Sequence, residues 1–228
     1  MGNIIFLIII NFIIIANMNI FCLGGSLTAG YPGYSPDGES NSNGEDDSNI
    51  QSQYQYWLEK LIKDFLDDNS SQLRIFNKGN PKDISSDLLK RIDRDIFQAL
   101  WTPDYCIIIT GTDDLFSEIP LAEILKNIKT LHALCEENDI ISIGATIPPV
   151  RYEQEKQSYK KHRKKLNQQL VSYFSQKKVP YTDLYEEMMD DTGNLPEKYA
   201  AYDGIHFSVK GYKKMGKLLF LQAIKQLL

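Results

Sequence analysis

Short apolar runs rich in β-branched residues alternate along this chain with longer amphipathic segments. This alternation is typical of βαβ units, in which helices join parallel strands and cover the sheet. It predicts an α/β protein with a parallel sheet. The predicted strands are residues 19–23, 73–77, 105–110, 140–145 and 179–182.

Between these runs, apolar residues recur at the 3.6-residue period that places them on one face of a helix. The third strand contains Ile107, Ile108 and Ile109 in succession, as expected for a central strand covered on both faces. These patterns predict a three-layer α/β/α sandwich. The predicted helical stripes are Ile50, Tyr54, Trp57, Leu61 and Phe65; Ile84, Leu88, Ile92, Ile96 and Leu100; Leu121, Leu125, Ile128, Leu131 and Cys135; and Val209, Tyr212, Met215 and Leu219.

The first residues resemble the core of a signal peptide, since residues 4–15 are apolar apart from Asn11. The run is too short to span a bilayer comfortably, and it lacks both a preceding Lys or Arg and a good cleavage site. We therefore expect no stable membrane insertion. Residues 1–17 are interpreted as an extension with Met18 as the native start, and residues 18–228 as one cytoplasmic domain. Export is the alternative if residues 1–16 act as a signal peptide.

Charge and cysteine usage argue against several kinds of partner. The formal net charge is −5, whereas binding nucleic acid needs a clustered basic face, so no nucleic-acid partner is expected. The basic run at 160–165 lies in a segment of helical periodicity and predicts a solvated helix face. Cys22, Cys106 and Cys135 lie in apolar runs without CxxC spacing, and are interpreted as buried thiols. We expect no cofactor and no metal, because one histidine beside scattered carboxylates is not a ligand set.

One long irregular segment covers residues 31–49, which are rich in Gly, Ser, Asn and Pro. Its charged residues are all acidic. Loops of this length are usually functional or disordered. The segment is interpreted as a flap over a site, and a plain acidic surface loop is the alternative.

Chemically useful residues follow three of the predicted strands. Ser26 follows the first strand, Gly79 the second, and the sequence Gly111-Thr112-Asp113-Asp114 the third. Ligands of open parallel sheets bind beyond the carboxyl ends of the strands. With the common strand order 2-1-3-4-5, these three strands are neighbours, and their ends converge within roughly 10 Å. The sequence therefore predicts one pocket.

The chain resembles the SGNH-type (GDSL) hydrolases, a family of esterases and lipases with a flavodoxin-like, doubly wound parallel sheet of five strands. The resemblance rests on four motifs in the family's order, spread over nearly the whole chain. It implies that Ser26 is the nucleophile, His206 the general base and Asp203 the residue that orients the base. It also implies an oxyanion hole formed by the backbone N–H groups of Ser26 and Gly79 and the side chain of Asp113. The motifs are Gly24-Gly25-Ser26-Leu27, Asn77-Lys78-Gly79, Gly111-Thr112-Asp113-Asp114 and Asp203-Gly204-Ile205-His206.

The chemistry of the residues supports the same roles. A serine hydroxyl is a weak nucleophile until an imidazole takes its proton, and a carboxylate must hold that imidazole in the right tautomer. Of the three histidines, His132 lies in a helical stripe and His162 in the basic run. Only His206 has a carboxylate, Asp203, three residues away in a turn.

The sequence departs from the family at three positions. Gly25 replaces the usual Asp, which affects the geometry of the turn. Lys82 stands where the second motif usually has a further glycine. Asp113 replaces an Asn that donates to the oxyanion, and an ionised carboxylate has no proton to donate. Either Asp113 stays protonated through burial beside Asp114, or it points away and two backbone donors suffice.

The sequence allows three functions. The first is an esterase that cleaves a small-molecule ester, an acyl or acetyl ester, through an acyl-serine intermediate. The second is a weakened relative that binds an acyl or glycosyl ligand in the same pocket. The third, a nucleotide-binding protein that uses Gly24-Gly25-Ser26 as a phosphate loop, lacks the usual lysine and glycine signatures. The sequence predicts neither the acyl chain length nor the oligomeric state.

Overall fold

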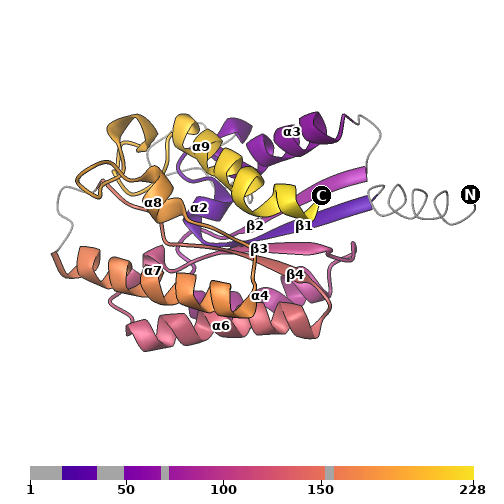
Figure 1. Ribbon diagram of the computed structural model, residues 1–228, viewed down its shortest axis with the longest axis horizontal. Coiled ribbons are helices and arrows are strands. Elements are labelled where there is room, and N and C mark those ends of the chain that lie inside the picture. The colour runs from indigo at the N-terminus through magenta and orange to yellow at the C-terminus, as the bar shows by residue number, and fades with distance from the viewer. Residues whose placement is uncertain (1–16, 35–48, 68–71, 152–156) are drawn as a thin grey trace, which may run out of the picture.

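The computed structural model of the chain describes residues 17–34, 49–67, 72–151 and 157–228 (Figure 1). Within these residues all paired strands are parallel and form one five-stranded sheet in the order β2-β1-β3-β4-β5. This is the flavodoxin-like, doubly wound order, so the predicted fold class is confirmed. The strands are β1 (Asn17–Gly24), β2 (Gln72–Gly79), β3 (Tyr105–Ile109), β4 (Ile141–Ala145) and β5 (Tyr181–Thr182).

Helices cover both faces of the sheet and complete the three layers. α3 and α9 pack against each other over one face, and α4, α6 and α7 lie over the other (Figure 1). The α-helices are α2 (Ser26–Ala29), α3 (Tyr54–Leu66), α4 (Ser85–Ile92), α5 (Thr112–Phe116), α6 (Leu121–Glu137), α7 (Gln157–Lys177), α8 (Leu184–Met188) and α9 (Val209–Leu219). Short 3₁₀ or π segments are η1 (Ile50–Ser52), η2 (Asp93–Phe97), η3 (Glu197–Tyr199), η4 (Phe220–Ile224) and η5 (Lys225–Leu227).

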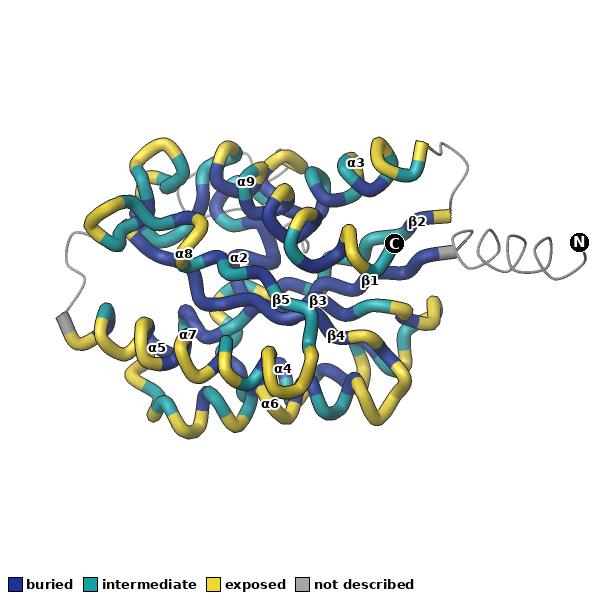
Figure 2. The backbone as a smooth tube through the Cα atoms, viewed as in Figure 1, coloured by how far each residue is buried: buried dark blue, intermediate teal, exposed yellow. Residues whose placement is uncertain are grey.

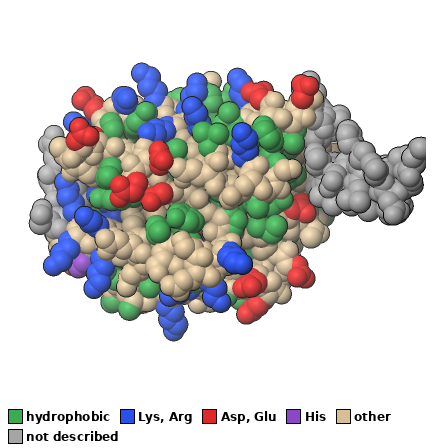
Figure 3. All heavy atoms as spheres, in the orientation of Figure 1, with side chains coloured by type: hydrophobic (Ala, Val, Ile, Leu, Met, Phe, Trp, Pro, Cys, Tyr) green, Lys and Arg blue, Asp and Glu red, His purple; other side chains and the backbone are tan. Residues whose placement is uncertain are grey.

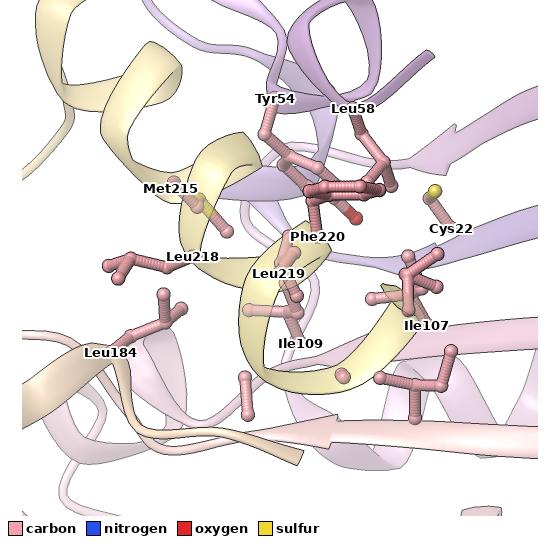
Figure 4. Packing of buried hydrophobic residues seen from close by; sticks show 14 of the residues in the cluster. Cys22, Tyr54, Leu58, Ile107, Ile109, Leu184, Met215, Leu218, Leu219 and Phe220 are labelled. Carbon is pink, nitrogen blue, oxygen red and sulfur yellow. The ribbon is translucent and has the colours of Figure 1, made fainter. Parts of the chain in front are cut away.

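The alternation of side chains along the strands divides the core between the two faces. In β3, Ile107 contributes to the cluster under α3 and α9, and Ile108 to the cluster under α4 and α6. Figure 2 shows the central strands buried along their length. Figure 4 shows Ile107 and Ile109 of β3 in the same buried cluster as Leu219, at the end of α9, and Phe220, at the start of η4. Burial on both faces explains the uninterrupted isoleucine run.

Several element boundaries differ from the predicted ones. β2 extends beyond Asn77 to Gly79, because its ladder with β1 continues to the end of both strands. β5 is only two residues long, since Val179 is held by a hydrogen bond to Phe174 and Pro180 has no N–H to donate. The second helical stripe was too long: α4 ends at Ile92, and Leu100 lies beyond η2 with 91% of its surface exposed.

The prediction of a fully solvated basic helix face is wrong at one residue. The run lies in α7, and His162 is exposed as expected. Arg163, however, is buried, and its guanidinium lies over the rings of Tyr159 and Tyr185. The long aliphatic stem of arginine and its stacking on aromatic rings allow this placement.

The N-terminal residues 1–16 and most of the predicted flap, 35–48, lie outside the described residues. None of the helices in the described part of the chain is long and apolar enough to cross a membrane. Cys22, Cys106 and Cys135 are free and buried, as predicted. On the face drawn in Figure 3, basic side chains are scattered among acidic and apolar ones.

Candidate active site

Ser26 lies at the carboxyl end of the central part of the sheet. β1 ends at Gly24, and Ser26 is the first residue of the short helix α2, where it is buried. Two side-chain amides hold the far end of α2: Gln55 donates to the Thr28 carbonyl at 2.8 Å, and Asn77 donates to the Ala29 carbonyl at 3.0 Å. The turn that carries Ser26 is therefore fixed by its neighbours.

His206 and Asp203 lie in the loop between η3 and α9. One oxygen of Asp203, Oδ1, accepts hydrogen bonds from the backbone N–H groups of Ile205 and His206, both at 2.9 Å. The other oxygen, Oδ2, lies 2.6 Å from Nδ1 of His206. Phe207, the next residue, is buried and anchors the loop in the core. One carboxylate therefore folds the turn and orients the imidazole.

The fold brings Ser26, His206 and Asp203 together although 180 residues separate the first two. Nε2 of His206 lies 2.9 Å from Oγ of Ser26, within hydrogen-bond distance. Burial alone would raise the pKa of Asp203, but hydrogen bonds from His206, its charge and the N–H of Ile205 lower the pKa below its usual value. An ionised Asp203 therefore faces Nδ1. This arrangement can transfer a proton from the serine hydroxyl to Nε2.

The other two histidines lie away from this chemistry. His132 is buried in α6, its Nδ1 lies 2.8 Å from Ser142 Oγ, and burial lowers its pKa to about 4. His162 is on the exposed side of α7. Their structural placement agrees with the packed and solvated roles that the sequence predicted.

The role of the Gly79 N–H as an oxyanion donor stays a prediction, and the structure shows the present acceptor of that group. That N–H donates to Oδ1 of Asn77 at 2.9 Å. Gly79 also allows close packing, since a Cβ there would lie 2.0 Å from the Ala29 nitrogen. Lys82, in the position of the family's further glycine, has a φ of 72°, the left-handed conformation that favours glycine.

Asp113 and Gly25, two of the departures from the family, are neighbours in space. A Cβ on Gly25 would lie 3.1 Å from Oδ2 of Asp113 and 3.0 Å from the carbonyl oxygen of Asp83. The glycine thus makes room for the carboxyl group. Burial raises the pKa of Asp113, and the charges of Asp114 and Asp83 raise it further, while the charge of His206 opposes the shift. Residues 25–27, 83 and 109–113 line one small pocket.

Two residues of the site were not found from the sequence. The ring of Tyr31 packs edge-on against the imidazole of His206, with 4.5 Å between ring centroids. Tyr31 is the first residue of the predicted flap, residues 31–49, but the sequence does not reveal its contact with His206. Ser85, at the start of α4, binds the carboxylate of Asp114 beside the pocket. Nothing in the local sequence of Ser85 distinguishes it from any residue that begins a helix.

The described residues hold no group of three or more His, Cys, Asp or Glu side chains arranged to bind a metal ion.

Comparison with known proteins agrees with the geometry. The model of the GDSL-like lipase/acylhydrolase family matches residues 22–214, whereas no curated protein matches the chain. A G-D-S-L family protein from Desulfitobacterium hafniense is 26% identical, with a TM-score of 0.69 over 89% of this chain and 97% of its own. A lipase/acylhydrolase from Enterococcus faecalis is 25% identical, with a TM-score of 0.66 over 89% and 93%.

An acetyl xylan esterase from Geobacillus stearothermophilus shares the fold at 16% identity, with a TM-score of 0.69 over 91% of this chain and 94% of its own. The family match covers most of the described chain and includes the positions of Ser26, Asp203 and His206. The chain therefore belongs to the GDSL-like lipase/acylhydrolase family and is a hydrolase that acts on ester bonds.

Proposed function

We propose that the protein is a serine esterase that hydrolyses a carboxylic ester through an acyl-serine intermediate on Ser26. The observation that carries this proposal is the contact of 2.9 Å between Ser26 Oγ and His206 Nε2, with Asp203 at 2.6 Å behind the imidazole. The base is thus within hydrogen-bond reach of both the nucleophile and the orienting carboxylate before substrate binds.

The reaction follows from these contacts. Oγ of Ser26 attacks the carbonyl carbon while its proton passes to Nε2 of His206, and Asp203 stabilises the imidazolium. The imidazolium then gives this proton to the leaving alcohol, which leaves the acyl group on Ser26. A water molecule repeats the sequence on the acyl-serine, releases the carboxylic acid and restores the serine.

The oxyanion needs donors, and we assign them to the loops around Gly25. Within the described residues, neither the N–H of Ser26 at the start of α2 nor the N–H of Lys82 has a hydrogen-bond acceptor. The third donor is Asp113 in its protonated form, which the raised pKa favours. A neutral carboxyl group in an apolar site can donate to an oxyanion, whereas its ionised form would repel it.

The substrate proposed is an ester with a short acyl group, such as an acetyl ester. The pocket beside Ser26, lined by residues 25–27, 83 and 109–113, is small, which favours a small acyl group. The likeness to an acetyl xylan esterase is compatible with that choice.

The test is hydrolysis of p-nitrophenyl acetate by the wild type and by Ser26→Ala, purified side by side. Turnover that is lost in Ser26→Ala, with a burst of p-nitrophenol equal to the enzyme concentration, supports the proposed acyl-serine mechanism. Equal rates in the two proteins, or none in either, would contradict it. The remaining interpretation would then be a relative that binds an acyl or glycosyl ligand without turning it over.

A further inference from the structure

The backbone carbonyl of Gly24 accepts a hydrogen bond from the side chain of Arg91. Gly24 ends β1, two residues before Ser26, and its oxygen accepts a hydrogen bond from Nη2 of Arg91 at 2.9 Å. The backbone N–H of Asn80 donates to the same oxygen at 3.0 Å. Arg91 belongs to α4, 67 residues away in sequence, so a helix on one face of the sheet reaches the turn that carries the serine.

The guanidinium of Arg91 is itself held in a nearly buried network. Its Nε lies 2.6 Å from Oδ2 of Asp83, and its Nη1 lies 2.7 Å from Oδ2 of Asp95. The three side chains are only 11–13% exposed. Two carboxylates that form ion pairs with one planar guanidinium fix its orientation as well as its position. The third donor, Nη2, can then hold the Gly24 carbonyl in one direction.

The same network includes the second loop of the site. Asp83 belongs to the turn that closes with the hydrogen bond from its own N–H to the Asn80 carbonyl at 3.2 Å. Its carbonyl oxygen lies 3.0 Å from the position that a Cβ on Gly25 would occupy. One guanidinium therefore joins the end of β1 to the turn that contains Lys82.

The local sequence explains why such a link matters. Gly24 and Gly25 are adjacent glycines, which restrict the backbone less than any other pair of residues. The peptide between Gly25 and Ser26 carries the N–H assigned to the oxyanion, and misplacement of such a donor lowers the rate. Gly24 is closely packed, since a Cβ there would lie 2.4 Å from the Ile109 carbonyl oxygen. Gly25 is packed less closely, since the nearest backbone atom to a Cβ there would be the Asp83 carbonyl oxygen at 3.0 Å.

We propose that Arg91 is a positioning residue, which fixes the Gly24–Gly25 turn and the Asn80–Asp83 turn relative to each other and so orients the donors around Ser26. This inference rests on the proposed esterase function. Arg91 touches neither the substrate nor the reacting atoms, and it acts through the Gly24 carbonyl and the carboxylate of Asp83.

The test compares Arg91→Ala with Arg94→Ala in the full chain. Arg94 is a matched control, because its Nε lies 2.6 Å from the other oxygen of Asp95, yet its side chain is 74% exposed and does not contact Gly24. The measurements are kcat and KM for p-nitrophenyl acetate, kcat in the presence of tens of millimolar guanidinium chloride or of equal sodium chloride, and amide hydrogen exchange of residues 24–29.

We expect Arg91→Ala to lower kcat by about 10- to 100-fold with little change in KM, as for a misplaced catalytic group. Guanidinium, but not sodium, should restore part of kcat in Arg91→Ala and none in Arg94→Ala. Exchange in residues 24–29 should become faster only in Arg91→Ala. Unchanged kcat, an equal loss in Arg94→Ala, or no difference between the two salts would overturn the proposal.

If Arg91→Ala does not fold, Arg91→Lys decides, because its single ammonium cannot hold both carboxylates and the Gly24 carbonyl in the same geometry. A kcat equal to that of the wild type in Arg91→Lys would overturn the proposal. If the wild type itself shows no Ser26-dependent turnover, the esterase function fails separately. Hydrogen exchange of residues 24–29 then tests the positioning role of Arg91. Faster exchange in Arg91→Ala than in Arg94→Ala supports that role, and equal exchange in the two variants overturns it.

Discussion

The carboxylate of the fully buried Asp114 accepts hydrogen bonds from both the backbone N–H and the hydroxyl of Ser85. Ser85, the first residue of α4, is thereby joined to α5, the short helix that contains Asp113. Asn127 of α6 donates to the same hydroxyl at 3.0 Å. Burial raises the pKa of Asp114, and the bonds from Ser85 partly offset that rise. The carboxylate of Asp114 thus links the start of α4 to α5 beside the pocket.

Asp114→Ala should destabilise the protein by about 3 kcal/mol, because it leaves the N–H and hydroxyl of Ser85 buried without their acceptor. Urea unfolding followed by circular dichroism measures this loss of free energy of unfolding. The control is Asp64→Ala on the exposed side of α3, where a change within about 0.5 kcal/mol is expected. Equal effects of the two substitutions would contradict a structural role for Asp114.

Asp203→Asn should lower kcat by about 10⁴-fold while the fold is retained, a magnitude known from the same change in serine proteases. Asn keeps an oxygen for the N–H groups of Ile205 and His206, so the turn persists. The new amide would donate to Nδ1 and force the proton of the imidazole onto Nε2. That nitrogen could then no longer accept the proton of Ser26.

Steady-state kinetics with p-nitrophenyl acetate, together with thermal unfolding, separate these two effects of Asp203→Asn. A variant with an unchanged melting temperature and lost kcat agrees with the tautomer argument. Retention of more than about a tenth of wild-type kcat would show that Asp203 does not orient the base.

The fold was predictable from the sequence because burial dictates the period of apolar residues. Ile107, Ile108 and Ile109 required a strand covered on both faces, and the structure places them at the centre of the sheet. Element ends were less predictable. Leu100 continued a helical period, but the chain leaves the helix after a π segment and exposes the side chain.

The pairing of Asp203 with His206 was predictable, because both residues belong to one short motif. Asp203 and His206 lie three residues apart, so their contact is local, and the order of the strands brings Ser26 to them. The sequence does not reveal that the side chain of Asn77 turns back to accept a hydrogen bond from the N–H of Gly79. Arg91 was missed since its contact with Gly24 exists only in three dimensions.

Asp113→Asn should change the pH dependence of the reaction. Burial raises the pKa of Asp113, and the protonated form is the proposed donor, so wild-type kcat should fall as the pH rises through that pKa. Asn donates at every pH and does not titrate. The variant should therefore exceed the wild type by about 10-fold or more at pH 9, given the usual cost of one lost donor.

The rates for Asp113→Asn need correction for spontaneous ester hydrolysis, and Ser26→Ala under the same conditions provides it. Parallel pH profiles of the wild type and Asp113→Asn would rule out Asp113 as a proton-bearing donor. The oxyanion would then depend on the backbone N–H groups alone.

Tyr31→Ala should lower kcat by about 3- to 10-fold, because edge-on aromatic contacts contribute about 0.5–1.5 kcal/mol to holding a ring in place. The ring of Tyr31 lies against His206, and its loss frees the imidazole to rotate away from Ser26. Tyr31→Phe keeps the ring and should retain most of kcat. A loss in Tyr31→Phe as large as that in Tyr31→Ala would assign the effect to the hydroxyl group.

His132 should make the protein less stable as the pH falls from 6.5 to 4. Burial lowers its pKa from 6.5 to about 4 in the folded protein, so between these values the unfolded chain binds more protons than the folded one. Lowering the pH therefore favours unfolding, by up to about 3 kcal/mol over this window. The pKa of Asp203 is lowered in the folded protein, so its protonation causes a further loss of folding stability at more acidic pH.

The measurement is the free energy of unfolding in urea at several pH values for the wild type, His132→Gln and the exposed-site control His162→Gln. His132→Gln loses the titrating ring that packs beside Ser142, so its stability should depend less steeply on pH than that of the wild type. His162→Gln should keep the wild-type slope, because the side chain of His162 is exposed and has no part in the buried cluster around His132. Equal slopes in all three proteins would mean that His132 takes up a proton within the folded structure as readily as in the unfolded chain.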